Sequence, residues 1–323
     1  MRAVVVPEHG GSEVLRADDW PDPSPGPGQL LVSVAAAGVN FVDIYRREGR
    51  PPYAGAVPYV PGAEGAGTVT AVGEGVTTFQ PGDRVVWSDS PGSYAQQAVV
   101  AERGAVKVPA GVGLEQAAAV MLQGLTAHYL SHSTYPVAAG DVAVVHAAAG
   151  GVGLLLTQMV GLRGGVVVAT TSTSAKAQLA VEVGAQHVAG YDDFGAVVRE
   201  ITGGAGAAVV YDGVGQATFD DSLAALRPRG YMVLYGAASG PVPPFELQRL
   251  NTGGSLFVTR PTLGSYIASR GELLERTGDL FDWIQDGRLA VRIGGRYPLA
   301  EAARAQDDLA ARRTTGKLLL LPG

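Results

Sequence analysis

The spacing of apolar residues changes near residue 113 and divides the chain into two kinds of predicted secondary structure. Up to about residue 119, apolar residues come in short runs that are separated by turn-forming residues. Such runs predict β-strands, at Ala3–Val6, Leu30–Ala35, Gly67–Val72, Arg84–Trp87 and Gln96–Val100. Short strands at this spacing are typical of a small barrel or sandwich.

Beyond Gly113 the pattern first has the period of a helix, over Leu114–Ser131, and then alternates between strands and helices. The predicted strands are Val142–Val145, Val166–Thr170, Val188–Ala189, Ala208–Tyr211 and Tyr231–Tyr235, and the predicted helices are Leu154–Leu162, Ala175–Val183, Phe194–Ile201 and Phe219–Leu226. This order is that of parallel βαβ units, so the fold class is α/β with a doubly wound parallel sheet. A later helix, Glu272–Gln285, precedes a β-like tail, Lys317–Leu321, which is predicted to rejoin the first module.

A turn of small residues follows the first strand of the predicted parallel sheet, over His146–Gly153. A strand, a glycine turn and a helix in this order are typical of dinucleotide binding. Gly150 lets the backbone approach a pyrophosphate, and Gly153 lets the helix lie close to its strand. Ala148 stands at the first position of the usual G-x-G-x-x-G pattern, and the chain contains 46 glycines, so a plain turn is the alternative.

The residues after the second parallel strand indicate which dinucleotide is bound. Enzymes that prefer NAD place a carboxylate there, about 20 residues past the glycine turn. Here Thr171–Lys176 contains hydroxyl side chains and the Lys176 ammonium but no carboxylate, which predicts NADPH. The alternative is structural: Ser174 caps the next helix, and Lys176 is a solvated residue of its first turn.

Composition excludes several classes of function. The chain has no cysteine, which rules out disulfides, thiolate nucleophiles and cysteine-bearing zinc sites. Its five histidines are scattered and are expected to be packed or exposed residues rather than metal ligands. A net charge of −6 argues against nucleic acid as a partner. No signal peptide and no apolar stretch of about 18 residues is recognised, so the expected location is the cytoplasm, without a membrane.

Six stretches, in this order along the chain, together resemble the medium-chain dehydrogenase/reductase superfamily and, within it, the zinc-free NADPH:quinone oxidoreductases related to zeta-crystallin. They are Ala37–Asp43, Gly62–Gly67, Gln123–Ala127, His146–Gly153, Tyr211–Gly215 and Ser255–Pro261. The resemblance implies a GroES-like β-rich catalytic domain, residues 1–122 and 263–323, and a Rossmann NADPH-binding domain, residues 123–262. Zinc-dependent relatives carry cysteine and histidine where this chain has Asn40 and Ala63, so no metal is expected.

The resemblance also implies the site residues. Substrate would lie against Asn40, Tyr45 and Tyr53, while no residue is assigned a certain catalytic role. NADPH would contact Asn40, Thr126, Ala149, Gly150, Gly151, Val152, Gly153, Ser172, Lys176, Tyr191, Gly236, Ser239, Phe257, Val258, Thr259 and Arg312. Structural alternatives stay open for several: a turn cap for Asn40, packing for the tyrosines, a hydrogen bond within its own helix for Thr126, an edge strand for Phe257–Thr259 and a surface charge for Arg312.

The leading function implied is reduction of a quinone, or of a similar conjugated carbonyl compound, by NADPH. An alternative is NADPH-dependent reduction of the C=C bond of an enone or enal, because the same hydride can be transferred to carbon. A non-enzymatic alternative is a crystallin-like or RNA-binding protein, which the acidic composition does not favour. The expected assembly is a homodimer.

Overall fold

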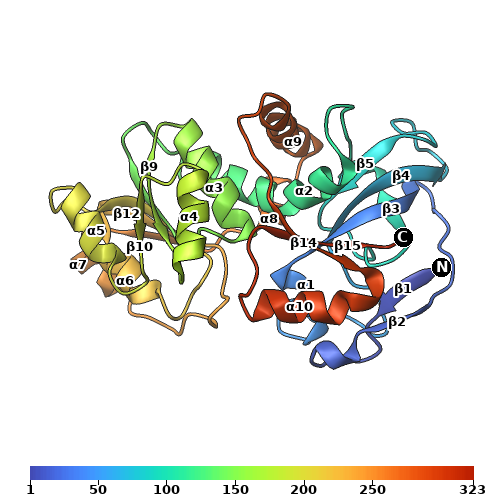
Figure 1. Ribbon diagram of the computed structural model, residues 1–323, viewed down its shortest axis with the longest axis horizontal. Helices are drawn as coiled ribbons and strands as arrows, with labels where there is room; N and C mark the ends of the chain where they lie inside the picture. Colours follow the sequence, from blue (N-terminus) through green and yellow to red (C-terminus); the bar gives the residue numbers. More distant parts are fainter. The chain divides into compact units, whose positions relative to one another are not determined.

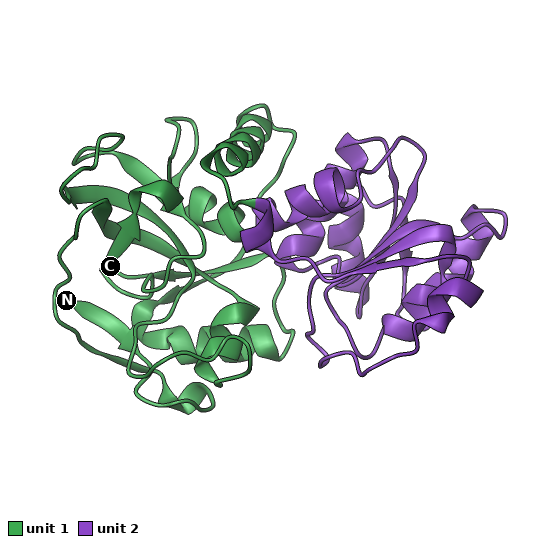
Figure 2. Ribbon diagram, turned by 180° about the vertical axis from the view of Figure 1, so that it is seen from behind, with its two compact units in different colours: residues 1–122, 267–323 green, residues 123–266 purple.

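In the computed structural model, which describes residues 1–323, the chain forms two compact units. Unit 1 contains Met1–Leu122 and Ile267–Gly323, and unit 2 contains Gln123–Tyr266 (Figure 2). The helix α2, Leu114–Tyr129, begins in unit 1 and ends in unit 2, where a π-helical segment, Leu130–Thr134, continues it. None of the helices is both long and apolar enough to span a membrane.

Unit 1 is a β-rich module, as the short apolar runs predict (Figure 1). Its main sheet has seven strands in the order β14-β15-β3-β4-β5-β7, with β6 also paired to β3. These strands are β3 Gln29–Val39, β4 Glu64–Val72, β5 Arg84–Trp87, β6 Gln97–Ala101, β7 Ala105–Lys107, β14 Ile293–Pro298 and β15 Lys317–Leu321. The tail β15 pairs antiparallel with β3, which confirms the predicted return of the chain to the first module.

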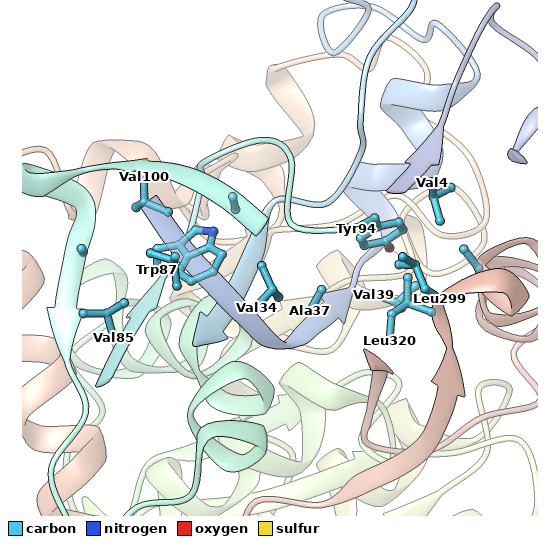
Figure 3. Packing of buried hydrophobic residues seen from close by; sticks show 14 of the residues in the cluster. Val4, Val34, Ala37, Val39, Val85, Trp87, Tyr94, Val100, Leu299 and Leu320 are labelled. Carbon is cyan, nitrogen blue, oxygen red and sulfur yellow. The ribbon is translucent and has the colours of Figure 1, made fainter. Parts of the chain in front are cut away.

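The remaining elements of unit 1 surround this sheet. They are the β1–β2 pair (Arg2–Val5 and Arg16–Asp19), α1 Phe41–Arg47, α9 Arg270–Gln285, α10 Ala302–Ala310 and the 3₁₀ turns Ser12–Val14, Glu102–Gly104 and Leu299–Glu301. The core is formed by inward-facing aliphatic residues of the strands around two large aromatic side chains, Trp87 and Tyr94 (Figure 3). Burial of this apolar surface is the main stabilising contribution to the unit.

Unit 2 contains the predicted doubly wound sheet. Its six strands are all parallel, in the order β10-β9-β8-β11-β12-β13. The strands are β8 Val142–Val145, β9 Val166–Thr170, β10 His187–Ala189, β11 Ala207–Asp212, β12 Leu226–Leu234 and β13 Phe257–Thr259. The helices are α3 Gly151–Leu162, α4 Ser174–Glu182, α5 Phe194–Ile201, α6 Phe219–Ala224, α7 Gln248–Thr252 and α8 Leu263–Tyr266.

The predicted helix Phe219–Leu226 is wrong at its end. Leu226 is the first residue of β12, which pairs with β11 at Ala207, and the helix α6 stops at Ala224. Pro228 lies two residues further on and cannot donate a helical hydrogen bond. The apolar character of Leu226 serves a buried strand rather than a helix face.

Candidate functional site

The loop between β8 and α3 brings the start of a helix to the carboxyl edge of the parallel sheet. Ala147 has a left-handed conformation, with φ of 51°, and Gly150 is the N-cap of α3 without a side-chain cap. A Cβ atom on Gly153 would lie 2.5 Å from the Ala147 carbonyl oxygen and 2.6 Å from Ala148 Cα. The close approach therefore requires glycine, and the first N–H groups of α3 remain available to an anion.

One polar atom beside this turn lacks a partner. Gln123 Oε1 is buried without a hydrogen bond, and a Cβ atom on Gly151 would overlap the Gln123 amide. A buried acceptor without a donor costs free energy, so such an atom needs an explanation. A bound molecule with an N–H or O–H group provides one, which makes the turn fit a dinucleotide.

The residue that caps the helix after β9 differs from the prediction, in which Ser174 is the cap. The N-cap of α4 is Thr173, whose hydroxyl accepts a hydrogen bond from the Lys176 N–H at 3.3 Å. Ser174 is the first residue of the helix, so it is not the cap. Ser172 is exposed and Lys176 half-buried, and the carboxylate-free segment lies at the carboxyl edge of the sheet, where ligands bind in this fold.

His146 lies directly after β8 and is completely buried. Its Nδ1 is 2.8 Å from Thr170 Oγ1, and its Nε2 is 2.9 Å from Ser222 Oγ. The Ser222 hydroxyl donates a hydrogen bond to Asp212 at 3.4 Å. It therefore accepts a hydrogen bond from the imidazole, which places the ring proton on Nε2. Burial lowers the pKa of His146 to about 4, against the raising effect of Asp212. His146 is thus a packed, neutral histidine that ties together the ends of β8 and β9.

The structure places the other predicted cofactor residues of unit 2 on separate elements. Tyr191 follows β10, and its ring stacks on His146 with a centroid distance of 6.0 Å. Thr126 is buried in α2. Gly236 and Ser239 follow β12, and Ser239 Oγ accepts from the Ala217 N–H at 3.0 Å. Phe257, Val258 and Thr259 form the edge strand β13.

Arg312 and Asn40 belong to unit 1, unlike the other predicted cofactor residues. Arg312 is exposed just after α10, with φ of 56°. Asn40 is buried between β3 and α1. The predicted cofactor residues are thus divided between the two units, with all but these two in unit 2.

Asn40 lies in a cluster of buried polar side chains. Its Nδ2 donates to Glu64 Oε1 at 3.0 Å, and its Oδ1 accepts from Lys317 Nζ at 2.8 Å. Lys317 and Glu64 form a direct ion pair in which both side chains are buried. Asn40 is also the N-cap of α1, and the Asp43 carboxylate accepts from the Asn40 N–H at 2.9 Å as part of a capping box. Asn40 thus has the capping role that the structural alternative predicts, and its side chain also has hydrogen-bond partners from other parts of unit 1.

Burial dominates the electrostatics of this cluster. It raises the pKa of Asp43 to about 6, although the Asn40 N–H and the Tyr94 hydroxyl act in the opposite direction. It also lowers the pKa of Lys317 to about 7. The Glu64 carboxylate in direct contact favours the ammonium form of Lys317, so the two residues form a charged pair.

Tyr45 and Tyr53 lie together in unit 1. Their rings are tilted with a centroid distance of 5.6 Å, and Phe41 lies 6.2 Å from Tyr45 on the same helix. The Arg50 guanidinium is 5.3 Å from the centre of the Tyr45 ring. These side chains form an aromatic cluster that begins with Phe41, directly after the Asn40 cap.

Lys317, Asp43 and Glu64 are not among the predicted site residues. Two of these residues are unusual in their local sequence: Lys317 is the first residue of an otherwise apolar strand, and Glu64 lies in a glycine-rich stretch. Neither feature shows which residue the side chain contacts, because residues 40, 64 and 317 are far apart in the sequence.

Two further features bear on the chemistry. No group of three or more His, Cys, Asp or Glu residues is arranged to hold a metal ion. A surface cavity of about 430 Å³ in unit 1 is lined by Phe79, Lys107 and Phe281 among others, and by none of the predicted site residues.

Two family models match the chain. "Alcohol dehydrogenase GroES-like domain" matches residues 26–110, and "Zinc-binding dehydrogenase" matches residues 151–280. The chain is 45% identical to a quinone oxidoreductase of Pseudomonas aeruginosa, with 97% of each protein covered. It is 41% identical to a 2-haloacrylate reductase of a Burkholderia species, with 99% of this chain and 98% of that protein covered.

A solved structure has the same fold over the whole length. The quinone oxidoreductase of Escherichia coli, in complex with NADPH, is 40% identical to this chain, with a TM-score of 0.96 and 100% of both chains covered.

Proposed function

Because the chain belongs to the quinone oxidoreductase family of the medium-chain dehydrogenase/reductase superfamily, we propose that it reduces a quinone with NADPH and without a metal ion. The observation that supports the proposal best is a combination of two features: a glycine turn in which Gly153 allows a close backbone approach, and an end of β9 that has no carboxylate. The first feature suits a pyrophosphate, and the second suits a 2′-phosphate.

The residues that would hold NADPH are those of unit 2, with Asn40 and Arg312 as contributions from unit 1. The N–H groups of Gly151, Val152 and Gly153 bind the pyrophosphate, with Ala149 and Gly150 shaping the turn. Ser172 and Lys176 would bind the 2′-phosphate, and Tyr191 would contact the adenosine side. Thr126, Gly236, Ser239 and the backbone of Phe257–Thr259 would contact the nicotinamide part. When bound, NADPH supplies a hydride.

The aromatic cluster of Tyr45, Tyr53 and Phe41 is suited to binding a flat substrate. Rings at 5.6 Å and 6.2 Å provide an apolar wall on which a quinone ring can stack. Placement of the acceptor next to the hydride donor is then the protein's main contribution to rate. The two oxygens of a reduced quinone can take protons from water, so we assign no indispensable proton donor.

The residues at the relevant positions support a metal-free mechanism. Asn40 and Ala63 replace the cysteine and histidine expected of zinc-dependent relatives, and the chain has no cysteine anywhere. The Asn40 side chain is bonded to Lys317 and Glu64 instead.

A second activity, reduction of a conjugated C=C bond, is favoured by one observation. A relative with 41% identity over nearly the whole chain is a 2-haloacrylate reductase, and a haloacrylate carries a C=C bond conjugated to a carboxyl group. Hydride transfer to carbon would use the same placement of NADPH.

We further assign the catalytic domain to residues 1–122 and 263–323 and the NADPH-binding domain to residues 123–262. We expect a homodimer joined through β13, because this edge strand exposes Phe257 to 48%, next to a stacked Tyr231. The cytoplasm is the expected location, which fits a chain without cysteine.

The direct test is oxidation of NADPH by the purified protein with a panel of quinones, enones and enals, with identification of each product. The proposal expects hydroquinones from quinones at the highest kcat/KM. Saturated products from enones at a higher kcat/KM than any quinone would replace the proposal by the second activity.

A further inference from the structure

The Gln123 side chain lies against the first residue of α3. A Cβ atom on Gly151 would overlap the Gln123 carboxamide, so the contact is possible only because residue 151 is glycine. Both residues belong to unit 2. Because α3 begins at the turn that we assign to the pyrophosphate, the Gln123 carboxamide borders the proposed dinucleotide site.

The carboxamide oxygen of Gln123 has no partner in the protein. Oε1 is buried without a hydrogen bond, whereas the residue as a whole is only half-buried, so part of the side chain is accessible. The last torsion of a glutamine is soft, and the amide can turn its oxygen or its nitrogen toward a ligand on the accessible side. An apolar side chain of the same shape would avoid the cost of the unsatisfied oxygen. Stability alone therefore gives no reason for glutamine at this position.

The contacts of α2 within unit 2 indicate which half of a dinucleotide Gln123 faces. The Tyr211 hydroxyl of β11 donates to the Leu130 carbonyl oxygen, just after α2, at 3.2 Å. Tyr129 of α2 stacks on Tyr266, which lies beyond β13, with a centroid distance of 4.2 Å. The end of α2 is therefore on the side of β8 that carries β11, β12 and β13. The proposed adenosine residues lie on the other side, after β9 and β10.

The position of Gln123 on its helix narrows the choice of ligand group. Gln123 and Thr126 are three residues apart in α2, so their side chains lie on the same face of the helix. We assign Thr126 to the nicotinamide part of NADPH and Gly151 to the pyrophosphate. The group that connects these two parts is the nicotinamide ribose. Its hydroxyl groups can donate to an amide oxygen and accept from an amide nitrogen.

Resting on the proposed function, we propose that Gln123 binds the nicotinamide ribose of NADPH through hydrogen bonds between its carboxamide and the ribose hydroxyl groups. The unsatisfied oxygen of Gln123 then gains the donor that it lacks within the chain. Gln123 positions the nicotinamide half of the cofactor and makes no contribution to binding of the adenosine half.

The test compares the binding of two ligands to wild type and to Gln123→Met. NADPH contains the nicotinamide ribose, whereas adenosine 2′,5′-bisphosphate contains the 2′-phosphate but no nicotinamide half. Methionine has a similar length and keeps the packing on Gly151, but it has no amide. The dissociation constant of NADPH, measured by fluorescence, should rise roughly tenfold, as expected for the loss of one good hydrogen bond. That of the bisphosphate, measured by calorimetry, should stay within about twofold.

Stability and a matched control separate ligand binding from folding. The thermal midpoint of Gln123→Met without ligand should equal or exceed that of wild type, because the substitution removes an unsatisfied buried oxygen. Gln123→Leu removes the same amide with less volume and should bind both ligands as Gln123→Met does. The control is Gln158→Met in α3. The Gln158 amide donates to the Leu154 carbonyl oxygen of its own helix at 2.9 Å, so this variant should bind both ligands as wild type does.

Two results would overturn the proposal: wild-type NADPH affinity in both variants at position 123, or an equal loss of affinity for NADPH and for the bisphosphate. The second result would mean that Gln123 supports the shape of the turn and not the ribose. Failure of the proposed function is a separate outcome, in which wild type binds NADPH but reduces no quinone. The affinities for the two ligands then still decide the role of Gln123.

Discussion

The predicted site residues divide into two halves, one in each unit, and the two halves are built by different means. In unit 2, the turn at Ala147–Gly153 is made of backbone groups and small residues that are adjacent in the sequence. In unit 1, the Asn40 cluster is made of one amide and three ionisable side chains, from positions 40, 43, 64 and 317. An added side-chain atom is therefore expected to disrupt the tightly packed turn. The side-chain cluster is instead expected to be disrupted by removal of a charge or of a hydrogen-bond partner.

The strongest test of the backbone half is Gly153→Ala. The added methyl group would meet the Ala147 carbonyl oxygen at 2.5 Å, and overpacking of this kind costs about 1–3 kcal/mol of stability. Because the displaced backbone is the proposed pyrophosphate site, NADPH affinity should fall by roughly a hundredfold or more. Calorimetric titration with NADPH measures this affinity.

The control for this variant lies on the same helix. A Cβ atom on Gly161 would meet nothing within 4 Å, so Gly161→Ala should bind NADPH normally and gain about 0.5–1 kcal/mol of stability. Equal effects of the two substitutions would show that helix propensity, rather than the close approach, explains Gly153.

The next effect concerns acid stability and the buried His146. Burial lowers its pKa from 6.5 to about 4 in the folded state, so the unfolded chain binds the proton first. Its contribution to stability is complete above pH 6.5 and is lost as the pH falls through 4, about 3 kcal/mol at 1.36 kcal/mol per pH unit. Asp43 acts in the other direction, because its pKa is raised to about 6 and its contribution is lost as the pH rises through that value.

Comparison with a variant isolates the histidine, since Asp43 is common to both proteins. The free energy of unfolding of His146→Gln, measured by urea denaturation between pH 7 and pH 4, should fall less steeply than that of wild type. Parallel curves would mean that the imidazole is protonated in the folded protein.

Lys176→Ala tests the charge in the backbone half. A charge-assisted contact contributes about 1.5–3 kcal/mol, or roughly ten- to a hundredfold in affinity. We expect the dissociation constant of NADPH to rise by that factor and that of NADH to stay nearly unchanged. If both cofactors weakened alike, Lys176 would support the fold of the loop, and the 2′-phosphate site would lie elsewhere.

A smaller effect is expected at the aromatic wall of unit 1. Tyr45→Phe and Tyr53→Phe keep the rings that stack at 5.6 Å, so kcat should fall only a few-fold. Removal of a general acid typically costs about 10²–10⁴-fold. A loss in that range, with NADPH affinity and folding intact, would give that tyrosine a role in proton transfer.

The difference between the halves also explains what the sequence could predict. Strands β5, β9 and β15 and helix α5 match their predicted bounds, because each is a continuous local pattern. The resemblance to the quinone oxidoreductases is confirmed by the comparisons over nearly the whole chain. The short elements α1, β2, β7, β14 and α10 were not predicted, since strand pairing and packing rather than local pattern define them.

The candidate site divides in the same way. The glycine turn and the carboxylate-free end of β9 are contiguous and were identified from spacing. The partners of Asn40 were not, because Lys317 reaches it only through the pairing of β15 with β3. Thr173 took the place of Ser174 as the cap of α4 because the helix begins one residue earlier than predicted.

Removal of metal from the protein tests whether it reduces quinones with NADPH and without a metal ion. The protein is treated with a chelator and freed of metal, its metal content is checked by elemental analysis, and NADPH oxidation with a quinone is followed. We predict unchanged kcat/KM and no stoichiometric zinc, because Asn40 and Ala63 offer no thiolate or imidazole ligand. Activity that is lost on chelation and restored by zinc would contradict the claim.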